Sequence, residues 1–228
     1  SFPTRRSSDL IVRDETTGAA TGMLIDAAAL PVLQDIQYRS SYAKALPDLL
    51  KAAIRHLNSL GITAVLDAFA DEETQKAYVE LDRAGELNAR VTLAAPVMPD
   101  NFREEIPRIA QRRQSESPNV RLRYVKVFAD GNGEVGLASY LRRDGRGGKS
   151  PGYYSDNEMS ELVALAEKND LAVFVHSIGD GAARQVLDAI DTARRRSPVT
   201  SLRHTLTHLC WIDTADMPRL TRLVPAPG

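Results

Sequence analysis

Two histidines of the chain lie at or near the ends of short apolar segments that are typical of buried strands. His176 ends the segment Leu171–His176, and His208 lies near the end of Leu202–Cys210. Adjacent parallel strands lie about 4.8 Å apart and their carboxyl ends meet at one edge, so both side chains would share that edge. Two imidazoles this close can bind one metal ion at about 2.0–2.1 Å each. Because a histidine at a strand end is more often structural, a metal site and a structural pair both stay open.

The other two histidines and one nearby aspartate have plainer interpretations. His204 shares the side-chain parity of His208 but lies deeper in its strand, which favours a core role over a contact to a metal ligand or substrate. His56 lies in mid-helix beside Arg55, so we expect it on a solvated face. Asp180 follows His176 closely and either orients that histidine or caps the next helix.

Lys126 interrupts the otherwise apolar strand Tyr124–Phe128. Burying an ammonium group is costly, so such a lysine either finds a carboxylate or loses its proton. A neutral lysine can react with carbon dioxide to give a carbamate, an anionic bidentate ligand that can bridge two cations. The alternatives are an edge-strand position or an ion pair with Asp130.

Three glycines after this strand match a dinucleotide-binding pattern. Gly131, Gly133 and Gly136 fit G-x-G-x-x-G, which in a true fingerprint opens a helix and has an acidic residue about 20 positions further on. Here only Leu137–Leu141 follows before a second polar, glycine-rich stretch, and the nearest acids lie in a helix cap. A dinucleotide-binding oxidoreductase is therefore the alternative function, and a non-catalytic barrel scaffold is another.

The segment from Asp130 to Tyr154 is long for a connection between a strand and a helix, and it lies on the expected active-site face. Tyr153 and Tyr154 either line a substrate pocket there or pack the loop. Cys210, the only cysteine, is expected to lie in the core of its strand.

From residue 44 onward, helical and strand patterns alternate. The expected strands are 62–66, 90–96, 120–129, 171–176 and 202–210. The expected helices are 46–60, 71–84, 102–113, 155–168, 181–196 and 214–222. Pro47 fits a first turn, Gly61 fits the left-handed position past a helix end, and Ser155 with Glu158 forms a capping box. The alternation predicts an α/β fold with a parallel sheet, either a (β/α)₈ barrel or a doubly wound sheet.

The composition narrows the partners. The 228 residues are 43% hydrophobic and 26% charged, with a net charge of −1 and one cysteine. The balanced charge argues against nucleic-acid binding, and no apolar run approaches the roughly 18 residues of a membrane span. One cysteine excludes an intramolecular disulfide and a cysteine-rich zinc site. We therefore expect a cytoplasmic protein with a small-molecule partner.

Three segments in order resemble the amidohydrolase superfamily, in the branch that contains N-substituted formamide deformylases. They are Val125–Gly131, Val175–Asp180 and Leu202–His208. Upstream, Val12–Asp14, Thr21–Ile25 and Gly61–Val65 resemble the same branch. The resemblance covers nearly all of residues 11–224.

This resemblance implies a metal-dependent (β/α)₈ (TIM-like) barrel that hydrolyses non-peptide carbon–nitrogen bonds of the amide or formamide type. Lys126 matches the lysine that is carbamylated to bridge two metals, and His176 and His208 match the ligands on the fifth and sixth strands. The cofactor implied is a divalent metal, expected to be zinc, with one or two ions. Asp130, Asp180, His204, Tyr153 and Tyr154 are the further candidates near the ligands or substrate.

The chain departs from the family pattern in three places. The His-x-His pair of the first strand is expected before residue 11, and the general-base aspartate of the eighth strand beyond residue 228. Thr207 stands where the family usually has Glu. We therefore expect residues 44–228 to be an incomplete barrel holding strands two to about seven, and the chain alone to be inactive. Residues 11–43 are expected to be an appended or inserted segment, and residues 1–10 (SFPTRRSSDL) a non-native, adapter-derived scar.

Overall fold

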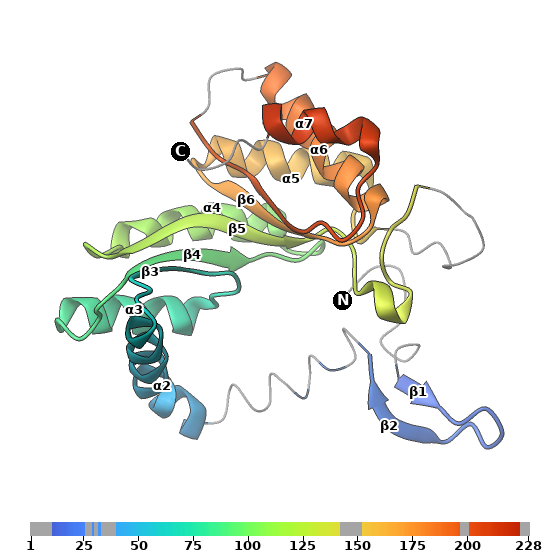
Figure 1. Cartoon of the computed structure of the whole chain (residues 1–228). Helices are drawn as coiled ribbons and strands as arrows, with labels where there is room; N and C mark the ends of the chain where they lie inside the picture. The colour runs from blue at the N-terminus through green and yellow to red at the C-terminus, as the bar shows by residue number, and fades with distance from the viewer. Residues whose placement is uncertain are drawn as a thin grey trace.

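The computed structural model describes residues 11–25, 29, 32, 40–141, 152–196 and 201–223. Within them, one five-stranded sheet has the order β3-β4-β5-β6-β7, with every neighbouring pair parallel (Figure 1). Its strands are β3 (Ala64–Asp67), β4 (Arg90–Pro96), β5 (Val120–Phe128), β6 (Ala172–Ser177) and β7 (Thr205–His208). The strands lie in chain order, so each one pairs with the strand before it. The prediction of an α/β fold with a parallel sheet is confirmed.

Helices connect the strands and cover the outer side of the curled sheet (Figure 1). They are α2 (Ser40–Ser59), α3 (Glu72–Arg83), α4 (Phe102–Arg112), α5 (Asp156–Lys168), α6 (Asp180–Arg196) and α7 (Met217–Leu223). Short 3₁₀ turns, η3 (Arg113–Ser115), η4 (Gly133–Val135) and η5 (Thr214–Asp216), complete the described elements. None of the helices described is long and apolar enough to cross a membrane.

The main core lies between the sheet and these helices. Val125 and Val127 of β5 and Val173 and Val175 of β6 are fully buried there among helix residues. Side chains alternate between the two faces of a strand, so the residues between these valines point to the opposite face. We call that opposite face, away from the helices, the inner face of the sheet. Lys126 and His176 both lie on it.

Local sequence signals explain several helix ends. The Ser155 hydroxyl accepts a hydrogen bond from the Glu158 N–H, and the Glu158 carboxylate accepts one from the Ser155 N–H, so the predicted capping box is confirmed. Gly61 follows α2 with a φ of 80°, also as predicted. The expectation for Pro47 is wrong, because α2 begins at Ser40 and Pro47 lies inside the helix.

The last strand is shorter than its sequence pattern. The apolar pattern predicts a strand over 202–210, whereas β7 covers Thr205–His208. The backbone leaves the extended region at its end, since His208 has a φ of 73° and Leu209 a φ of 42°. Cys210 consequently lies exposed, and its expected place in the core is wrong.

The appended segment contains a separate element. Strands β1 (Ile11–Arg13) and β2 (Ala20–Leu24) form an antiparallel two-stranded sheet. The expected scar, residues 1–10, lies outside the described residues.

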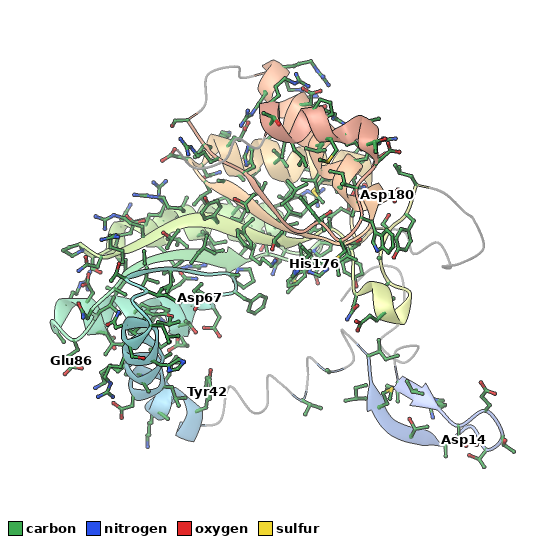
Figure 2. All side chains as sticks on the ribbon, in the orientation of Figure 1. Asp14, Tyr42, Asp67, Glu86, His176 and Asp180 are labelled. Atoms are coloured by element: carbon green, nitrogen blue, oxygen red, sulfur yellow. The ribbon has the colours of Figure 1, made fainter. Side chains whose placement is uncertain are left out.

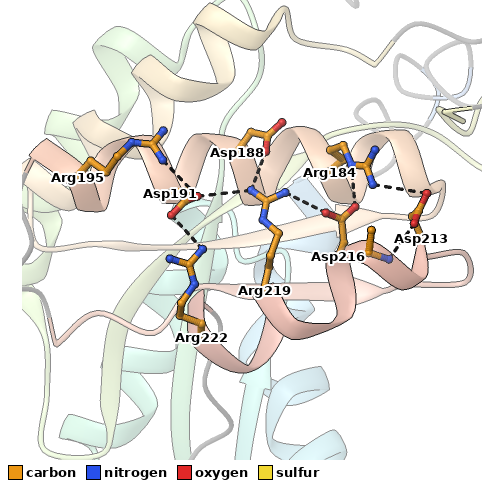
Figure 3. Close-up of polar contacts among 9 residues, drawn as sticks. Arg184, Asp188, Asp191, Arg195, Asp213, Asp216, Arg219 and Arg222 are labelled. Atoms are coloured by element: carbon orange, nitrogen blue, oxygen red, sulfur yellow. Dashed lines mark hydrogen bonds and ion pairs between the residues drawn. The ribbon is translucent and has the colours of Figure 1, made fainter.

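Helices α6 and α7 are joined by a network of arginine–aspartate ion pairs (Figure 3). Arg219 contacts Asp188 at 2.6 Å and Asp216 at 2.9 Å, and Arg184 also binds Asp216 at 2.9 Å. Asp216 is 2% exposed, so its carboxylate depends on these two arginines for compensation. The network fixes α7 on α6, behind the strands that carry the two candidate histidines.

Candidate metal centre

Lys126, His176 and His208 come together at the carboxyl end of the sheet. The rings of His176 and His208 meet edge to face with their centroids 4.6 Å apart. The Lys126 Nζ lies 4.8 Å from the centroid of the Phe128 ring, which in turn lies 5.3 Å from the His176 ring. Figure 2 labels His176 at this end of the sheet.

Strand register places Lys126 beside His176. Lys126 pairs with Phe174 and Phe128 pairs with His176 across β5 and β6. Lys126 and Phe128 share one face of β5, and Phe174 and His176 share the same face of β6, because residues two apart point the same way. Lys126 and His176 are therefore diagonal neighbours on the inner face.

His208 reaches the site by a different route. It pairs with Ser177, whose side chain points away from the inner face. An extended His208 would point away as well, but its φ of 73° turns the ring toward His176. This left-handed conformation is uncommon outside glycine. His208 is exposed, so the site is open to solvent on this side.

His176 presents a free nitrogen. Its Nε2 is buried and has no hydrogen-bond partner, and the nearest carboxylate oxygen, Asp130 Oδ1, lies 3.8 Å away. Burial, followed by the charges of His208 and Lys126, lowers the pKa of His176 to about 4, although a backbone hydrogen bond at Gly131 acts in the opposite direction. The ring is therefore neutral at pH 7 and forms no ion pair with Asp130. An unpartnered imidazole nitrogen is the group that a metal ion needs.

Lys126 is 5% exposed and lies in a central strand between β4 and β6, so the edge-strand alternative is wrong. Burial lowers the pKa of its amine to about 8. Among the described residues no carboxylate lies within ion-pair distance of its Nζ, so the alternative pairing with Asp130 is wrong too. Its ammonium lies over the faces of Phe128 and Phe174. A substantial neutral fraction at pH 7 to 8 makes this amine a nucleophile.

Asp130 fastens the loops around the site. Its carboxylate is fully buried and accepts hydrogen bonds from the N–H groups of Ile178 at 3.0 Å and of Gly179 and Ser139 at 2.9 Å. Burial raises the pKa of this carboxyl group, and the three N–H groups partly oppose the rise. Asp130 thereby joins the loop after β5 to the turn after β6. A Cβ at position 179 would meet the Ser139 carbonyl oxygen at 1.9 Å, so this close approach requires glycine.

Asp180 fills neither of its two expected roles. Its Oδ1 accepts a hydrogen bond from the Leu141 N–H at 2.9 Å. The N-terminus of α6 is closed by the Ser139 carbonyl, which accepts from the Gly181 N–H at 2.9 Å. These two hydrogen bonds thus join the loop after β5 to the start of α6.

The glycine-rich segment does not have the geometry of a dinucleotide fingerprint. Gly133–Val135 forms a 3₁₀ turn, which ends at Gly136 with a φ of 73°. Residues 137–141 are not helical and α5 begins only at Asp156. The third glycine therefore opens no helix that could hold a pyrophosphate.

Three candidates from the sequence lie away from the centre. His204 is 1% exposed; its Nδ1 accepts from the Val173 N–H at 3.1 Å and its Nε2 lies 3.0 Å from a Glu167 oxygen. Tyr153 and Tyr154 are buried in the core, with the Tyr154 ring packed edge-on against Phe102. These contacts favour packing for all three.

Aromatic residues near the centre escaped the sequence analysis. The Phe69 ring lies 6.0 Å from Phe128, and Tyr140 lies 6.5 Å from Trp211. The available signals were positional. Phe128 is two residues from Lys126 on the same face, and Trp211 is three residues past His208.

The donor set suits a metal ion, but it is small. Within the part of the chain that is described, no cluster of three or more His, Cys, Asp or Glu side chains could hold a metal. What the structure gathers is two imidazoles and one lysine. The unpartnered Nε2 of His176 is the feature that fits a metal best.

Comparisons with known proteins agree with this picture. A model of a protein family, described as "Amidohydrolase family", matches residues 4–228. The chain is 26% identical over 221 residues to "Putative amidohydrolase YtcJ" of Bacillus subtilis (strain 168), covering 94% of this chain and 40% of that protein. It is 25% identical over 195 residues to "N-substituted formamide deformylase" of Arthrobacter pascens, covering 82% of this chain and 35% of that protein. The chain thus spans well under half of either relative.

Two solved structures share the fold. An uncharacterized metal-dependent hydrolase from Pyrococcus furiosus has a TM-score of 0.72 and 23% identity, covering 94% of this chain and 44% of that one. Another from Pyrococcus horikoshii OT3 has a TM-score of 0.72 and 20% identity, covering 97% and 43%. With the curled parallel sheet, these likenesses confirm a partial TIM-like barrel.

Proposed function

Because this chain belongs to the amidohydrolase family, we propose that the protein it represents is a metal-dependent hydrolase of non-peptide carbon–nitrogen bonds. The observation that carries the proposal is the buried, unpartnered Nε2 of His176, whose ring centroid lies 4.6 Å from that of His208. A buried polar atom without a partner is costly, so its retention beside a second imidazole favours a bound ion.

The proposed ligands are His176, His208 and Lys126, and the proposed ion is zinc, as one or two ions. Zinc favours imidazole nitrogen and carboxylate-like oxygen donors, which this set can offer. When bound, such an ion supplies Lewis-acid polarisation of a carbonyl group and acidifies water at neutral pH. His176 needs no proton loss to serve, since its ring is already neutral at pH 7.

We propose that Lys126 is carbamylated. The neutral amine adds its lone pair to the carbon of carbon dioxide and then releases one proton, which leaves an N-linked carboxylate. Its buried position, with a pKa of about 8, supplies the neutral amine that this step needs. The product would place a second negative charge, besides the Asp130 carboxylate, next to an ion held by His176 and His208.

Asp130 would hold the site in shape. Its oxygens accept three backbone N–H groups, so it is engaged in positioning the loops and is poorly free to carry protons. No other described acid is grouped with the two histidines as a metal cluster would be. We therefore expect the 228-residue chain alone to turn over little substrate, since general acid–base catalysis is typically worth about 10²–10⁴-fold.

The substrate class we propose is a small amide or formamide. Support comes from the relative named N-substituted formamide deformylase and from an open site beside exposed His208. Hydrolysis assays of the chain with added zinc should stay near background. Sustained turnover that a chelator abolishes would show that the chain supplies its own proton carrier.

Metal binding to the chain tests the centre directly. Calorimetric titration with zinc should show binding that is lost in His176→Ala and in His208→Ala. His56→Ala is the matched control, because His56 is exposed on α2, and it should bind as the parent chain does. Equal zinc binding by the parent chain and the double variant His176→Ala/His208→Ala would refute the centre and favour a non-catalytic scaffold.

A further inference from the structure

Trp211 is the only tryptophan of the chain and is 59% exposed. Its ring meets Tyr140 edge to face, with centroids 6.5 Å apart and planes at 73°. Tryptophan side chains are large and mostly buried on average, so one left this open by a folded domain calls for a reason. We refer to Tyr140 and Trp211 as the aromatic pair.

The aromatic pair lies at the carboxyl end of β6. The Leu209 N–H donates to the Ser177 carbonyl at 2.9 Å, and the Trp211 N–H donates to the Ile178 carbonyl at 3.0 Å. The chain past His208 therefore runs alongside the turn that follows His176. A Cβ on Gly133 would meet the Tyr140 hydroxyl at 3.3 Å and the Ile178 side chain at 3.4 Å, so Tyr140 approaches the same turn from the loop after β5.

The aromatic pair also shares a charged neighbour with the proposed metal centre. The charges of Asp130, Asp180 and Cys210 contribute, after burial, to raising the pKa of Tyr140. Asp130 lies 3.8 Å from the Nε2 of His176. Tyr140 thus shares Asp130 as a neighbour with His176, and Trp211 lies three residues past His208, just beyond the end of β7.

The backbone on both sides of Tyr140 is fixed. The Ser139 N–H donates to Asp130 and its carbonyl accepts from the Gly181 N–H, while the Leu141 N–H donates to Asp180. Three backbone hydrogen bonds on the two residues that flank Tyr140 cost conformational freedom that a loose surface loop would keep. A rigid aromatic wall beside a polar centre is typical of small-molecule sites.

We propose that Tyr140 and Trp211 form a subsite that binds a flat aromatic group of the substrate. This inference rests on the proposed function, and it narrows the substrate class to amides that carry an aromatic ring. The exposed face of Trp211 would stack on the ring, while the amide group would extend toward His176 and His208. Tyr140 acts by holding the indole edge-on, because an edge-to-face pair restricts the tilt of both rings.

Nuclear magnetic resonance of the indole N–H tests the subsite without any catalysis, because the chain has a single tryptophan. The probes are benzamide and cyclohexanecarboxamide, which share the amide group and differ in ring flatness. Benzamide should shift the indole resonance saturably, with an affinity about 3- to 10-fold higher than that of cyclohexanecarboxamide, as expected for a ring–ring contact. Equal affinities, or no saturable shift with benzamide, would overturn the subsite and leave Trp211 as a surface for another partner.

One variant and its control test whether Tyr140 contributes to the contact with the aromatic ring. Tyr140→Leu should weaken benzamide binding by about 3- to 10-fold and leave cyclohexanecarboxamide unchanged. Tyr42→Leu, on α2 and far from His176 in Figure 2, is the matched control and should change neither. A loss of equal size for both probes in Tyr140→Leu would mean that this residue only supports the loop.

The same titrations with and without zinc separate the two proposals. Benzamide preference in a chain that binds no zinc would keep the subsite and refute the metal centre. Zinc binding that His176→Ala abolishes, without benzamide preference, would keep the metal centre and refute the subsite.

Discussion

His176 lies on β6 and His204 lies directly before β7, and their side chains have opposite environments. Both ring nitrogens of His204 have partners, Val173 on β6 and Glu167 on α5, and the side chain is sealed behind the sheet. His176 lies on the inner face with its Nε2 buried and unpartnered. The side chain of His204 thus connects its own segment to β6 and α5, whereas the Nε2 of His176 has no partner among the described residues.

The difference between the two histidines shows that burial by itself does not tell whether a polar group stabilises the fold. A buried polar group that is fully paired stabilises a packing arrangement, whereas one left unpaired carries a free-energy cost. His176 and His204 therefore differ in how completely their ring nitrogens are satisfied. This contrast can be tested by removing polar groups on both sides.

The largest expected effect is in His204→Ala. The Val173 N–H and the Glu167 carboxylate would both lose a partner in the interior. We expect the free energy of unfolding to fall by about 3 kcal/mol, more than the cost of one neutral group because one of the two can carry charge. Urea denaturation measures this. His56→Ala, an exposed control, should change it by less than about 0.5 kcal/mol.

If the free energy of unfolding fell by less than about 1 kcal/mol in His204→Ala, the contrast would be wrong, since the hydrogen bonds of His204 would then contribute little to stability.

Asp130→Asn comes next. The amide has one acceptor oxygen in place of two, so at least one of the three N–H groups at positions 139, 178 and 179 would face an NH₂ group. We expect a loss of about 2 kcal/mol and faster hydrogen exchange at those amides. Asp180→Asn should cost less, because the one oxygen that the amide retains can still accept from the Leu141 N–H. Equal losses would show that the front loops do not depend on Asp130.

Glu158 extends the comparison to a half-buried, paired group. Its hydrogen bonds with the Ser155 N–H and hydroxyl lower its pKa. A carboxyl whose folded pKa is lowered stabilises the fold above its unfolded pKa, and that contribution disappears as the pH falls through the folded pKa. Glu158→Gln should therefore reduce the loss of stability between about pH 5 and pH 3, by about 0.5 kcal/mol. Thermal denaturation across that range, with Glu104→Gln as the control, checks the prediction.

The smallest expected effect on stability is in His176→Leu. Removing the unpaired Nε2 from a largely buried site removes a cost, and losing the ring's backbone hydrogen bond at Gly131 adds one. The two oppose each other, so the free energy of unfolding should change by less than about 0.5 kcal/mol in either direction. Urea denaturation in a chelating buffer measures the apo chain. A loss as large as that of His204→Ala would mean that His176 is a structural residue as well.

Much of the fold follows from the sequence because its signals are local. Alternation of apolar strands and amphipathic helices predicted all five strands of the sheet and that they run parallel, but left their order open. The capping box at Ser155 and the glycine at position 61 fixed two helix ends closely. Pro47 misled, since tertiary packing of α2 extends the helix beyond the turn that proline favours.

The sequence predicted that Lys126, His176 and His208 lie close together, but not the backbone geometry that brings His208 there. Parity along the strand gives His176 its face, but His208 would have pointed away without its left-handed backbone, which no sequence pattern announces for a histidine. The same bend removes Cys210 from the strand and exposes Trp211. The sequence could not decide between pocket lining and packing for Tyr154, because its burial depends on Phe102 of α4, which is far away in the sequence.

The position of Asp130 in the chain also bears on how the protein folds. Its three N–H donors lie 9, 48 and 49 residues further along the chain, so two of them arrive only after β6 has been made. Until then this carboxylate can stay in water, and the strands before it can pair one after another as they emerge from the ribosome. The mouth of the barrel is thus expected to close late, after the sheet beneath it has formed. Errors in folding should accordingly spare the sheet and leave the site unformed.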